Sequence, residues 1–345
     1  MVSSPISSGS FHLLQELSGA EGKCKKTFAD KSTQVDFPPF DYDYLVWKRS
    51  VADEKDEFFT QYTGVNLSAF SALLLFLKSI DVLVINKFEM SLANQLLLTL
   101  IKLRTNFTYS HLVFLFGRSK ATISRVFRYN IEILSKSVSP LIKNVPAPYL
   151  CREIQPKAFL NSLTDKITLS IDCTDFKIVN DRKNLTNSCS FYSEYRGGQT
   201  LKALVAILPS GAIVFASDLF PGRISDKEIC LQSGFIDQLD PGHCLVVDKG
   251  FKIFDICPAG VTLCIPSFRN MEQFTNHQAL RSRVISSARS HVERVNERIK
   301  NYLILNRIPH QYRDIASDIF HVICFLINLQ PPIIAEVEDQ LNNTI

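Results

Sequence analysis

Two aspartates stand where strand-like runs end, so their carboxylates are the first candidates for chemistry. The run ITLSID ends at Asp172, and the run HCLVVD ends at Asp248. If the two strands are neighbours in one sheet, their ends lie side by side and bring the carboxylates together. The alternative is local, because an aspartate at the end of a strand also favours a turn. The first interpretation predicts an acidic site.

A third carboxylate, Glu293, lies on a long charged helix predicted over 277–305. The apolar stripe of this helix consists of Val284, Ala288, Val292, Val295 and Ile299. Glu293 falls on the opposite face, near Arg289. Three carboxylates from two strands and a helix form an all-oxygen site suited to Mg²⁺ or Mn²⁺. The alternative is that Glu293 pairs with Arg289, one helical turn earlier.

Asp226 is a secondary candidate ligand with a strong local explanation. The stretch from Ser225 to Glu228 has the S-x-x-E pattern of a capping box at a helix start. An aspartate in the first turn is also stabilised by the helix dipole. Asp226 could still face the acidic site, so both interpretations stay open.

The remaining residue types exclude several other classes of site. Nine cysteines contain no CxxC pair, which argues against a zinc knuckle and a disulfide framework and favours reduced thiols in an intracellular protein. The most apolar region, 67–85, is broken by Lys78 and Asp81, so we expect no membrane span. The N-terminus lacks the pattern of a signal peptide. The composition, 46% hydrophobic and 21% charged, is that of a soluble globular protein.

Basic side chains are concentrated in two segments. Residues 90–131 contain six Lys and Arg and no acid, and residues 277–313 contain eight against two glutamates. Such concentrations indicate a polyanionic partner. Two solvated helix faces would produce the same pattern.

The first basic segment has the pattern of a helix-turn-helix. We expect helices over 91–104 and about 108–116, the second capped by Thr108 or Asn106 and ended at Gly117, and a third from the N-cap Ser119 past Leu134. The third helix carries an apolar stripe on one side. The residues expected to contact DNA on its other side are Lys120, Arg125 and Arg128. The alternative is a plain three-helix bundle with a basic surface.

The second half of the chain alternates strands and helices. Strand-like runs occur at 167–172, 200–208, 211–219, 243–248 and 261–266. The stretch ILPSGAIV predicts a hairpin, and helices are expected at 225–239 and 277–305. This order predicts an α/β fold, a mixed sheet flanked by helices. The proline-rich stretch 145–156 predicts a linker before it.

Several motifs in this order resemble one family. They are IDCTDFKI, SEYRGGQTLKALVAILPSGAIVFAS, FPGRISDKEICLQSGF, LVVDKGF, TLCIPSF and SHVERVNERIK followed by LINLQPPII, which together cover about 167–334. They resemble the DDE-superfamily endonucleases of the PIF/Harbinger type, which are transposases and the nucleases derived from them. The segment from SLANQ to SRVF resembles the helix-turn-helix module of that family.

The resemblance implies an RNase H-like sheet preceded by a small all-α helix-turn-helix domain. It implies that Asp172, Asp248 and Glu293 form the catalytic triad and bind a divalent metal cation. DNA is the implied substrate, and the residues expected to hold it beside the triad are Arg289, Arg294, Arg298 and Lys300. It also implies a nuclear, and partly cytoplasmic, protein that works with a separate Myb-like DNA-binding partner, and a homo-oligomer is a further expectation.

The expected domains follow from these boundaries. They are a flexible tail at 1–37, a helical domain at 38–148 with its helix-turn-helix at about 91–134, a DDE endonuclease domain at 149–335 and a tail at 336–345. Two other functions stay open at this point. One is a domesticated DNA-binding or scaffolding protein without catalysis, and the other is a ribonuclease on the same fold.

Overall fold

The structure is a computed structural model that describes residues 52–79, 88–156, 166–179, 188–194, 196–248, 250–265 and 276–333. The tails expected at 1–37 and 336–345 lie outside these residues. Among the helices described, none is both long enough and apolar enough to cross a membrane.

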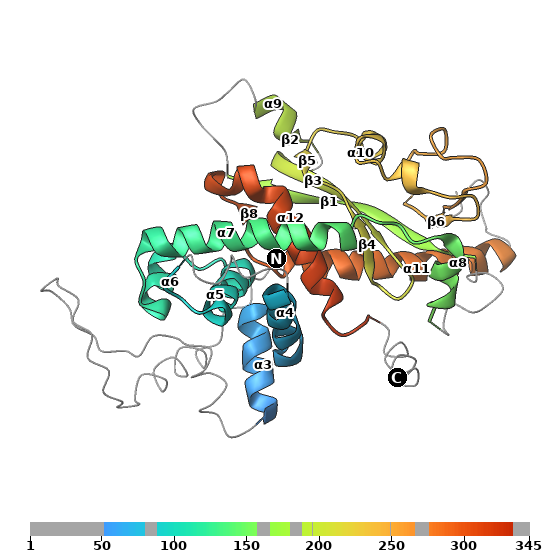
Figure 1. Cartoon of the computed structure of the whole chain (residues 1–345). Coiled ribbons are helices and arrows are strands. Elements are labelled where there is room, and N and C mark those ends of the chain that lie inside the picture. Colours follow the sequence, from blue (N-terminus) through green and yellow to red (C-terminus); the bar gives the residue numbers. More distant parts are fainter. Residues whose placement is uncertain are drawn as a thin grey trace, which may run out of the picture.

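One mixed sheet forms the centre of the C-terminal part (Figure 1). Its strands run in the order β2-β3-β1-β6-β7, while β4 and β5 also pair with β3 and β8 pairs with β1. β3 is antiparallel to β1 and β4, whereas β6 is parallel to both β1 and β7. The strands are β1 (Leu169–Ile178), β2 (Tyr192–Ser193), β3 (Gly198–Ile207), β4 (Ile213–Ala216), β5 (Phe220–Pro221), β6 (Cys244–Val246), β7 (Thr262–Cys264) and β8 (Arg307–Ile308).

Both faces of this sheet are covered, which explains the nearly continuous apolar runs of its strands. Along β3, Ala203 and Val205 belong to one core cluster, and Leu204 and Ala206 belong to another. This alternation follows from the two-residue period of a strand. The first cluster includes helices α7, α11 and α12, and the second includes α10. The expected RNase H-like α/β class is confirmed.

The helices of this part differ in length from those predicted. They are α8 (Pro148–Glu153), α9 (Ser188–Phe191), α10 (Asp226–Gln232), α11 (Asn276–Lys300) and α12 (Ala316–Asn328), with 3₁₀ turns η2 (Ser139–Leu141), η4 (Ile236–Gln238) and η5 (His310–Ile315). The prediction of a single helix over 225–239 is wrong. The chain turns at Gly234 (φ 72°), which separates α10 from the 3₁₀ turn η4. The predicted linker contains α8, which carries its proline in the first turn, where no amide donor is needed.

The helices of the predicted helix-turn-helix are present, and the ends given for them in the prediction differ from the observed ends by at most one residue. The helices before the sheet are α3 (Ala52–Thr63), α4 (Leu67–Ser79), α5 (Leu92–Thr105), α6 (Tyr109–Phe116) and α7 (Lys120–Val138). The side chains of Thr108 and Ser119 accept hydrogen bonds from the first turns of α6 and α7. Asn106 instead ends α5 in the left-handed conformation (φ 52°), and Gly117 ends α6 in the same way.

These helices pack on the sheet domain through a shared core. The ring of Phe127 on α7 lies 5.5 Å from that of Tyr312 in η5, and α7 packs against α12. One cluster of buried apolar residues runs from α3 through α7 to β3, α11 and α12. The helix-turn-helix is therefore held against the sheet domain. The domain boundary at residue 148 stays a prediction.

Candidate active site

Asp172 lies in the middle of β1, opposite Val205 of β3. The expectation that its strand ends there is wrong, because β1 continues to Ile178. Past Asp172, the buried side chains of Thr174 and Phe176 alternate with more exposed neighbours, so the strand keeps one face in the core. Burial of the Asp172 carboxyl raises its pKa to about 6.

Asp248 lies two residues past the end of β6, the strand next to β1, so the strand predicted to end at Asp248 ends at Val246 instead. β1 and β6 are parallel, and their register pairs Leu169 with Leu245 and Ser170 with Val246. Carried on by two residues, the same register sets Asp172 opposite Asp248. Adjacent strands lie about 4.8 Å apart, and residues paired in register point to the same face. The register of these two pairs therefore supports the predicted juxtaposition of the two aspartates.

The guanidinium of Arg289 joins the other two carboxylates of the predicted triad. Its Nη1 lies 2.6 Å from Oδ1 of Asp248, and its Nη2 lies 2.8 Å from Oε1 of Glu293. Glu293 sits on the exposed face of α11, as expected, while Val292 and Val295 are buried. The local pairing of Glu293 with Arg289 is thus present, together with a contact to Asp248.

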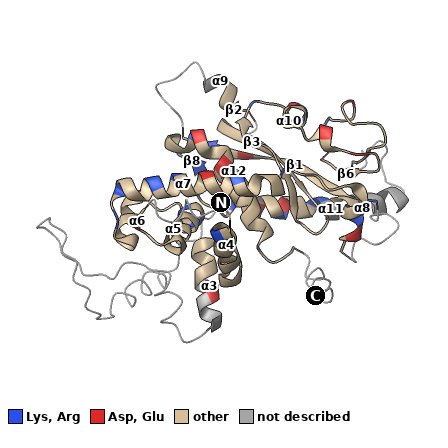
Figure 2. Ribbon diagram, in the orientation of Figure 1, with Lys and Arg blue, Asp and Glu red and all other residues tan. Residues whose placement is uncertain are grey.

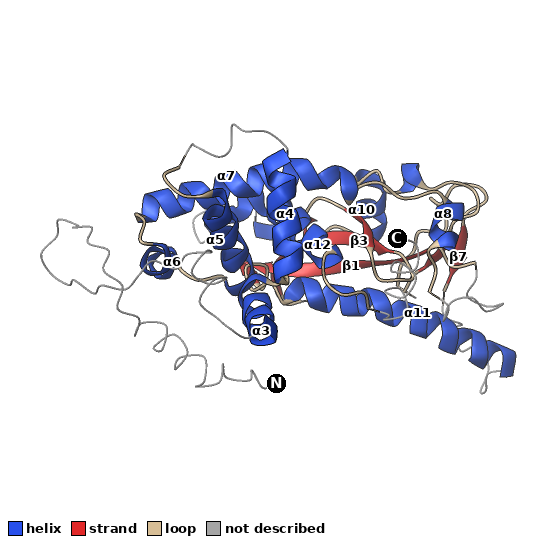
Figure 3. Ribbon diagram, turned by 60° about the horizontal axis from the view of Figure 1, so that its bottom comes forward, coloured by secondary structure: helices blue, strands red, loops and turns tan. Residues whose placement is uncertain are grey.

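Asn296 connects the same helix to Asp172. Its Nδ2 donates a hydrogen bond of 2.9 Å to Oδ2 of Asp172, and α11 lies along β1 (Figure 3). The Asn296 side chain is buried, and its Oδ1 has no hydrogen-bond partner among the residues that the structure describes. Sequence reasoning missed Asn296, although its place one turn after Glu293 and beside the apolar stripe was a signal.

The three predicted acids thus each contact helix α11 or belong to it. Their side chains are not arranged as a complete metal-binding site. Within the ranges that the structure describes, no three His, Cys, Asp or Glu side chains are arranged to hold a metal ion. The chemistry of the donors nevertheless fits a hard cation, since all are oxygen groups. The unpartnered Oδ1 of Asn296 adds a buried oxygen acceptor beside Asp172.

Asp226 lies close to Asp172 but has its own partner. It begins α10, and its Oδ1 accepts a hydrogen bond of 3.1 Å from Nζ of Lys202 on β3. The Ser225 cap of the predicted capping box is present. After burial, the charge of Asp226 is among the factors that raise the pKa of Asp172. Both open interpretations of Asp226 are thus compatible with its position.

The basic residues of α11 have different surroundings. Arg289 is bound within the acidic site, and Arg298 donates a hydrogen bond of 2.7 Å to the carbonyl of Pro331. Burial lowers the pKa of Arg298, as it does that of Lys300. The Asp172 carboxylate is one of the charges that act on Lys300. Arg294 is exposed. Arg294 and Lys300 are therefore the better candidates for contacts with a phosphate backbone.

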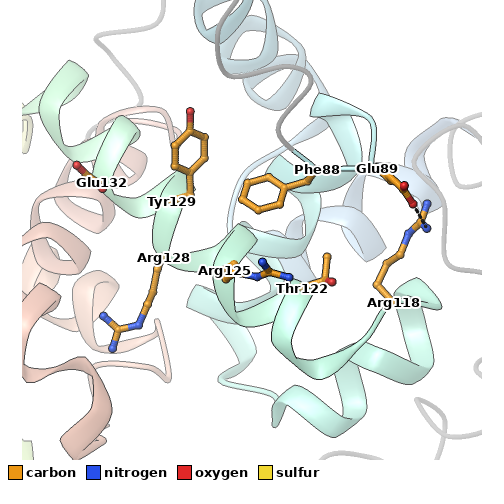
Figure 4. A pocket seen from close by; sticks show the side chains of 8 residues that line it. All are labelled: Phe88, Glu89, Arg118, Thr122, Arg125, Arg128, Tyr129 and Glu132. Atoms are coloured by element: carbon orange, nitrogen blue, oxygen red, sulfur yellow. Dashed lines mark ion pairs between the residues drawn. The ribbon is translucent and has the colours of Figure 1, made fainter.

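Helix α7, the third helix of the helix-turn-helix, lines an open groove of about 590 Å³ (Figure 4). Lys and Arg recur along this helix (Figure 2). The groove is lined by Phe88, Glu89, Arg118, Thr122, Arg125, Arg128, Tyr129 and Glu132. Phe88 and Tyr129 pack edge to face at 5.5 Å, and Arg118 pairs with Glu89 at 3.9 Å. Sequence reasoning did not include Phe88, which precedes the predicted helices.

The predicted DNA contacts on α7 divide into two kinds. Lys120 and Arg125 are at the exposed start of the helix. Arg128 instead donates a hydrogen bond of 2.7 Å to Asp314 and another to the carbonyl of Gln311, both in η5. In Figure 4 it points away from Arg125. Arg128 thus joins α7 to the sheet domain.

Two family models match the chain. Residues 171–328, from β1 to the end of α12, match the DDE superfamily endonuclease, and residues 88–140 match the helix-turn-helix of DDE superfamily endonuclease. The first match contains Asp172, Asp248 and Glu293. No curated protein matches the chain, and no solved structure does. These two segments are thus similar to the nuclease domain and to the helix-turn-helix of the DDE superfamily endonucleases, and the helix-turn-helix segment comes first in the chain.

Proposed function

We propose that the chain is a metal-dependent DNA endonuclease or transposase of the PIF/Harbinger type, and that Asp172, Asp248 and Glu293 are its catalytic residues. The observation that carries the proposal is the parallel register of β1 and β6, which would bring Asp172 and Asp248 level if it continued for two more residues. Contacts from α11 to both aspartates add Glu293 to the same place.

Nucleases of this superfamily generally use divalent metals, and Mg²⁺ or Mn²⁺ suits an oxygen-donor site. Such a cation supplies activation of a water molecule and stabilisation of the leaving oxygen. The carboxylates of Asp172 and Asp248 would hold the cation, and Glu293 would complete the set. Asn296 orients the carboxylate of Asp172. In the proposed reaction, water would attack the phosphorus in line and the 3′-oxygen of the broken phosphodiester would leave as a 3′-hydroxyl. In transposition, that 3′-hydroxyl would attack a second phosphodiester in line and displace its 3′-oxygen.

DNA would be held by the two basic regions. Lys120 and Arg125 would contact DNA from the start of α7, and Arg294 and Lys300 would contact the strand near the acids. A nuclear location, a Myb-like DNA-binding partner and a homo-oligomer belong to the same proposal, because they follow from the resemblance to the PIF/Harbinger type.

A second candidate function is DNA binding without catalysis. It is favoured by the contacts of Arg289, which pairs with both Asp248 and Glu293 and offsets part of their charge. A protein that kept these ion pairs permanently would retain the acids as structural groups. Catalysis and binding alone therefore differ in whether the acidic site accepts a cation.

The deciding experiment is nicking of supercoiled plasmid in Mn²⁺ by wild type and Asp248→Asn. The matched control is Asp237→Asn, an exposed aspartate of η4 in the same domain. Nicking by wild type and the control, lost in Asp248→Asn, supports the nuclease. Folded proteins that bind DNA but never nick it support the second candidate. Parallel RNA and RNA–DNA hybrid substrates test for a ribonuclease.

A further inference from the structure

Arg289 is bound by two of the acids to which the proposed function assigns a cation. Its two terminal nitrogens lie 2.6 Å from Asp248 and 2.8 Å from Glu293. These are distances of charge-assisted hydrogen bonds, and a planar guanidinium can bind two carboxylates at once. One side chain thus spans the strand end after β6 and the exposed face of α11.

The position of Arg289 on α11 makes both contacts possible. Glu293 follows it by one helical turn, so the two side chains lie on the same face of the helix. Asp248 reaches that face because α11 packs on β1 and β6. The side chain of Arg289 remains 33% exposed. It is therefore partly solvated in this position.

The two ion pairs compete with a cation for the same oxygens. A carboxylate oxygen that accepts a short hydrogen bond from a guanidinium has less negative charge to offer a metal ion. A divalent cation at Asp248 and Glu293 would also lie next to a fixed positive charge. The pairs are partly exposed and hence weak enough to be broken.

We propose that Arg289 is a resident counter-ion of the acidic site that must leave Asp248 and Glu293 before a divalent cation binds there. This inference rests on the proposed function, because it takes these acids as metal ligands. Arg289 is a positioning residue in this role: it holds the two carboxylates in place without metal and lowers their affinity for one. While it does so, it is not available to a DNA phosphate.

The test is a titration with Mn²⁺ alone, without DNA, in which electron paramagnetic resonance measures the free ion. We expect Arg289→Gln to bind Mn²⁺ on the order of tenfold more tightly than wild type, because two partly exposed ion pairs no longer compete. Arg289→Lys keeps the charge but lacks the planar guanidinium that binds two carboxylates at once. Its Mn²⁺ affinity should lie between those of wild type and Arg289→Gln.

Two controls make the result specific. Arg307→Gln removes an exposed arginine at the far end of β1, where Arg307 pairs with Lys177, and should leave Mn²⁺ affinity at the wild-type value. Asp248→Asn should weaken binding in both the wild-type and Arg289→Gln backgrounds. If Arg289→Gln does not fold, as judged by its thermal unfolding, the Arg289→Lys variant decides the question in the same titration.

The outcomes separate this inference from the proposed function. Mn²⁺ binding that depends on Asp248 but is unchanged or weaker in the Arg289 variants overturns the counter-ion role and leaves the nuclease standing. Binding that does not depend on Asp248 overturns the metal site itself. Tighter binding in Arg289→Gln, with Arg307→Gln unchanged, supports the inference.

Discussion

Asn296 holds Asp172 through a hydrogen bond of 2.9 Å from Nδ2 to Oδ2, although the two residues lie on different elements, α11 and β1. Asn296 is buried and Asp172 is partly buried, and burial raises the pKa of Asp172 to about 6. A backbone hydrogen bond from Cys173 and the charge of Arg289 oppose the effect of burial on this pKa. The amide of Asn296 orients the carboxylate.

We predict that Asn296→Leu weakens Mn²⁺ binding by about tenfold or more, a loss typical of removed partners of metal ligands. Leucine has a similar volume, so the packing of α11 on β1 should survive. The measurement is the Mn²⁺ titration described above, with thermal unfolding as a check of the fold.

The matched control for this change is Asn301→Leu, an exposed position just past the end of α11. It should leave Mn²⁺ affinity unaltered. Equal affinities for wild type and Asn296→Leu would show that Asp172 needs no help from the amide.

The start of α7 should carry the charge-dependent part of DNA binding. We predict that Lys120→Ala combined with Arg125→Ala lowers DNA affinity and reduces the slope of log K against log salt by about 1.8, as expected for two lost phosphate contacts. The measurement is fluorescence anisotropy of a labelled duplex at several salt concentrations.

Lys136→Ala supplies the comparison for that experiment. Lys136 lies on the same helix but pairs with Glu132 at 2.7 Å. Its removal should leave the salt slope close to the wild-type value. A double variant of Lys120 and Arg125 whose slope is also unchanged would place the DNA contacts elsewhere.

Arg128 should matter for stability more than for DNA. It binds Asp314 at 2.7 Å across the contact between α7 and η5. We predict that Arg128→Ala lowers the free energy of unfolding by about 0.5–1 kcal/mol, because both side chains are partly exposed. A double-mutant cycle with Asp314→Ala, followed by denaturant unfolding, should show coupling between the two residues. Additive effects of the two substitutions would mean that the ion pair contributes nothing to stability. A lower salt slope of DNA binding in Arg128→Ala would instead show that Arg128 contacts DNA.

The helix-turn-helix was predictable because its signals are local. Ser119 and Thr108 cap helices through contacts with residues three positions away, and Gly117 supplies a left-handed turn. Caps of this kind are legible in the sequence itself. The order of the strands was likewise visible in their apolar runs.

The contacts across the site were not legible in the same way. Arg289 and Glu293 are one helical turn apart, so their pairing was among the alternatives that the sequence allowed. The contact of Arg289 with Asp248 depends on how α11 packs on the sheet. Arg128 meets Asp314, 186 residues further on, for the same reason. The continuation of β1 past Asp172 was missed because polar residues such as Lys177 interrupt the apolar run on the more exposed face.

Lys102 is a buried cation between the helix-turn-helix and η5. It is 4% exposed, and its Nζ donates hydrogen bonds of 2.8 Å to Asn106 Oδ1 and 2.7 Å to the carbonyl of Phe107. The rings of Tyr109 and Tyr312 lie 5.4 and 5.5 Å away. Burial lowers the pKa of Lys102 to about 8.

This shift predicts that folding becomes more favourable as the pH rises above 8. Between about pH 8 and 10.5 the unfolded chain keeps the proton on Lys102 and the folded chain loses it. The unfolded state then binds more protons, so the free energy of unfolding increases with pH. We expect the difference between wild type and Lys102→Met to change by about 2 kcal/mol in favour of wild type from pH 7 to pH 10.

Taking the difference between the two proteins cancels the tyrosines and thiols that titrate in the same range. Lys136→Met removes an exposed lysine of α7 whose pKa is raised by its hydrogen bond to Glu132, so wild type should gain no stability over this variant as the pH rises. The measurement is urea unfolding at each pH. A flat curve for Lys102→Met would mean that Lys102 keeps its proton when folded, and that its two acceptors and two rings offset the cost of burying the charge.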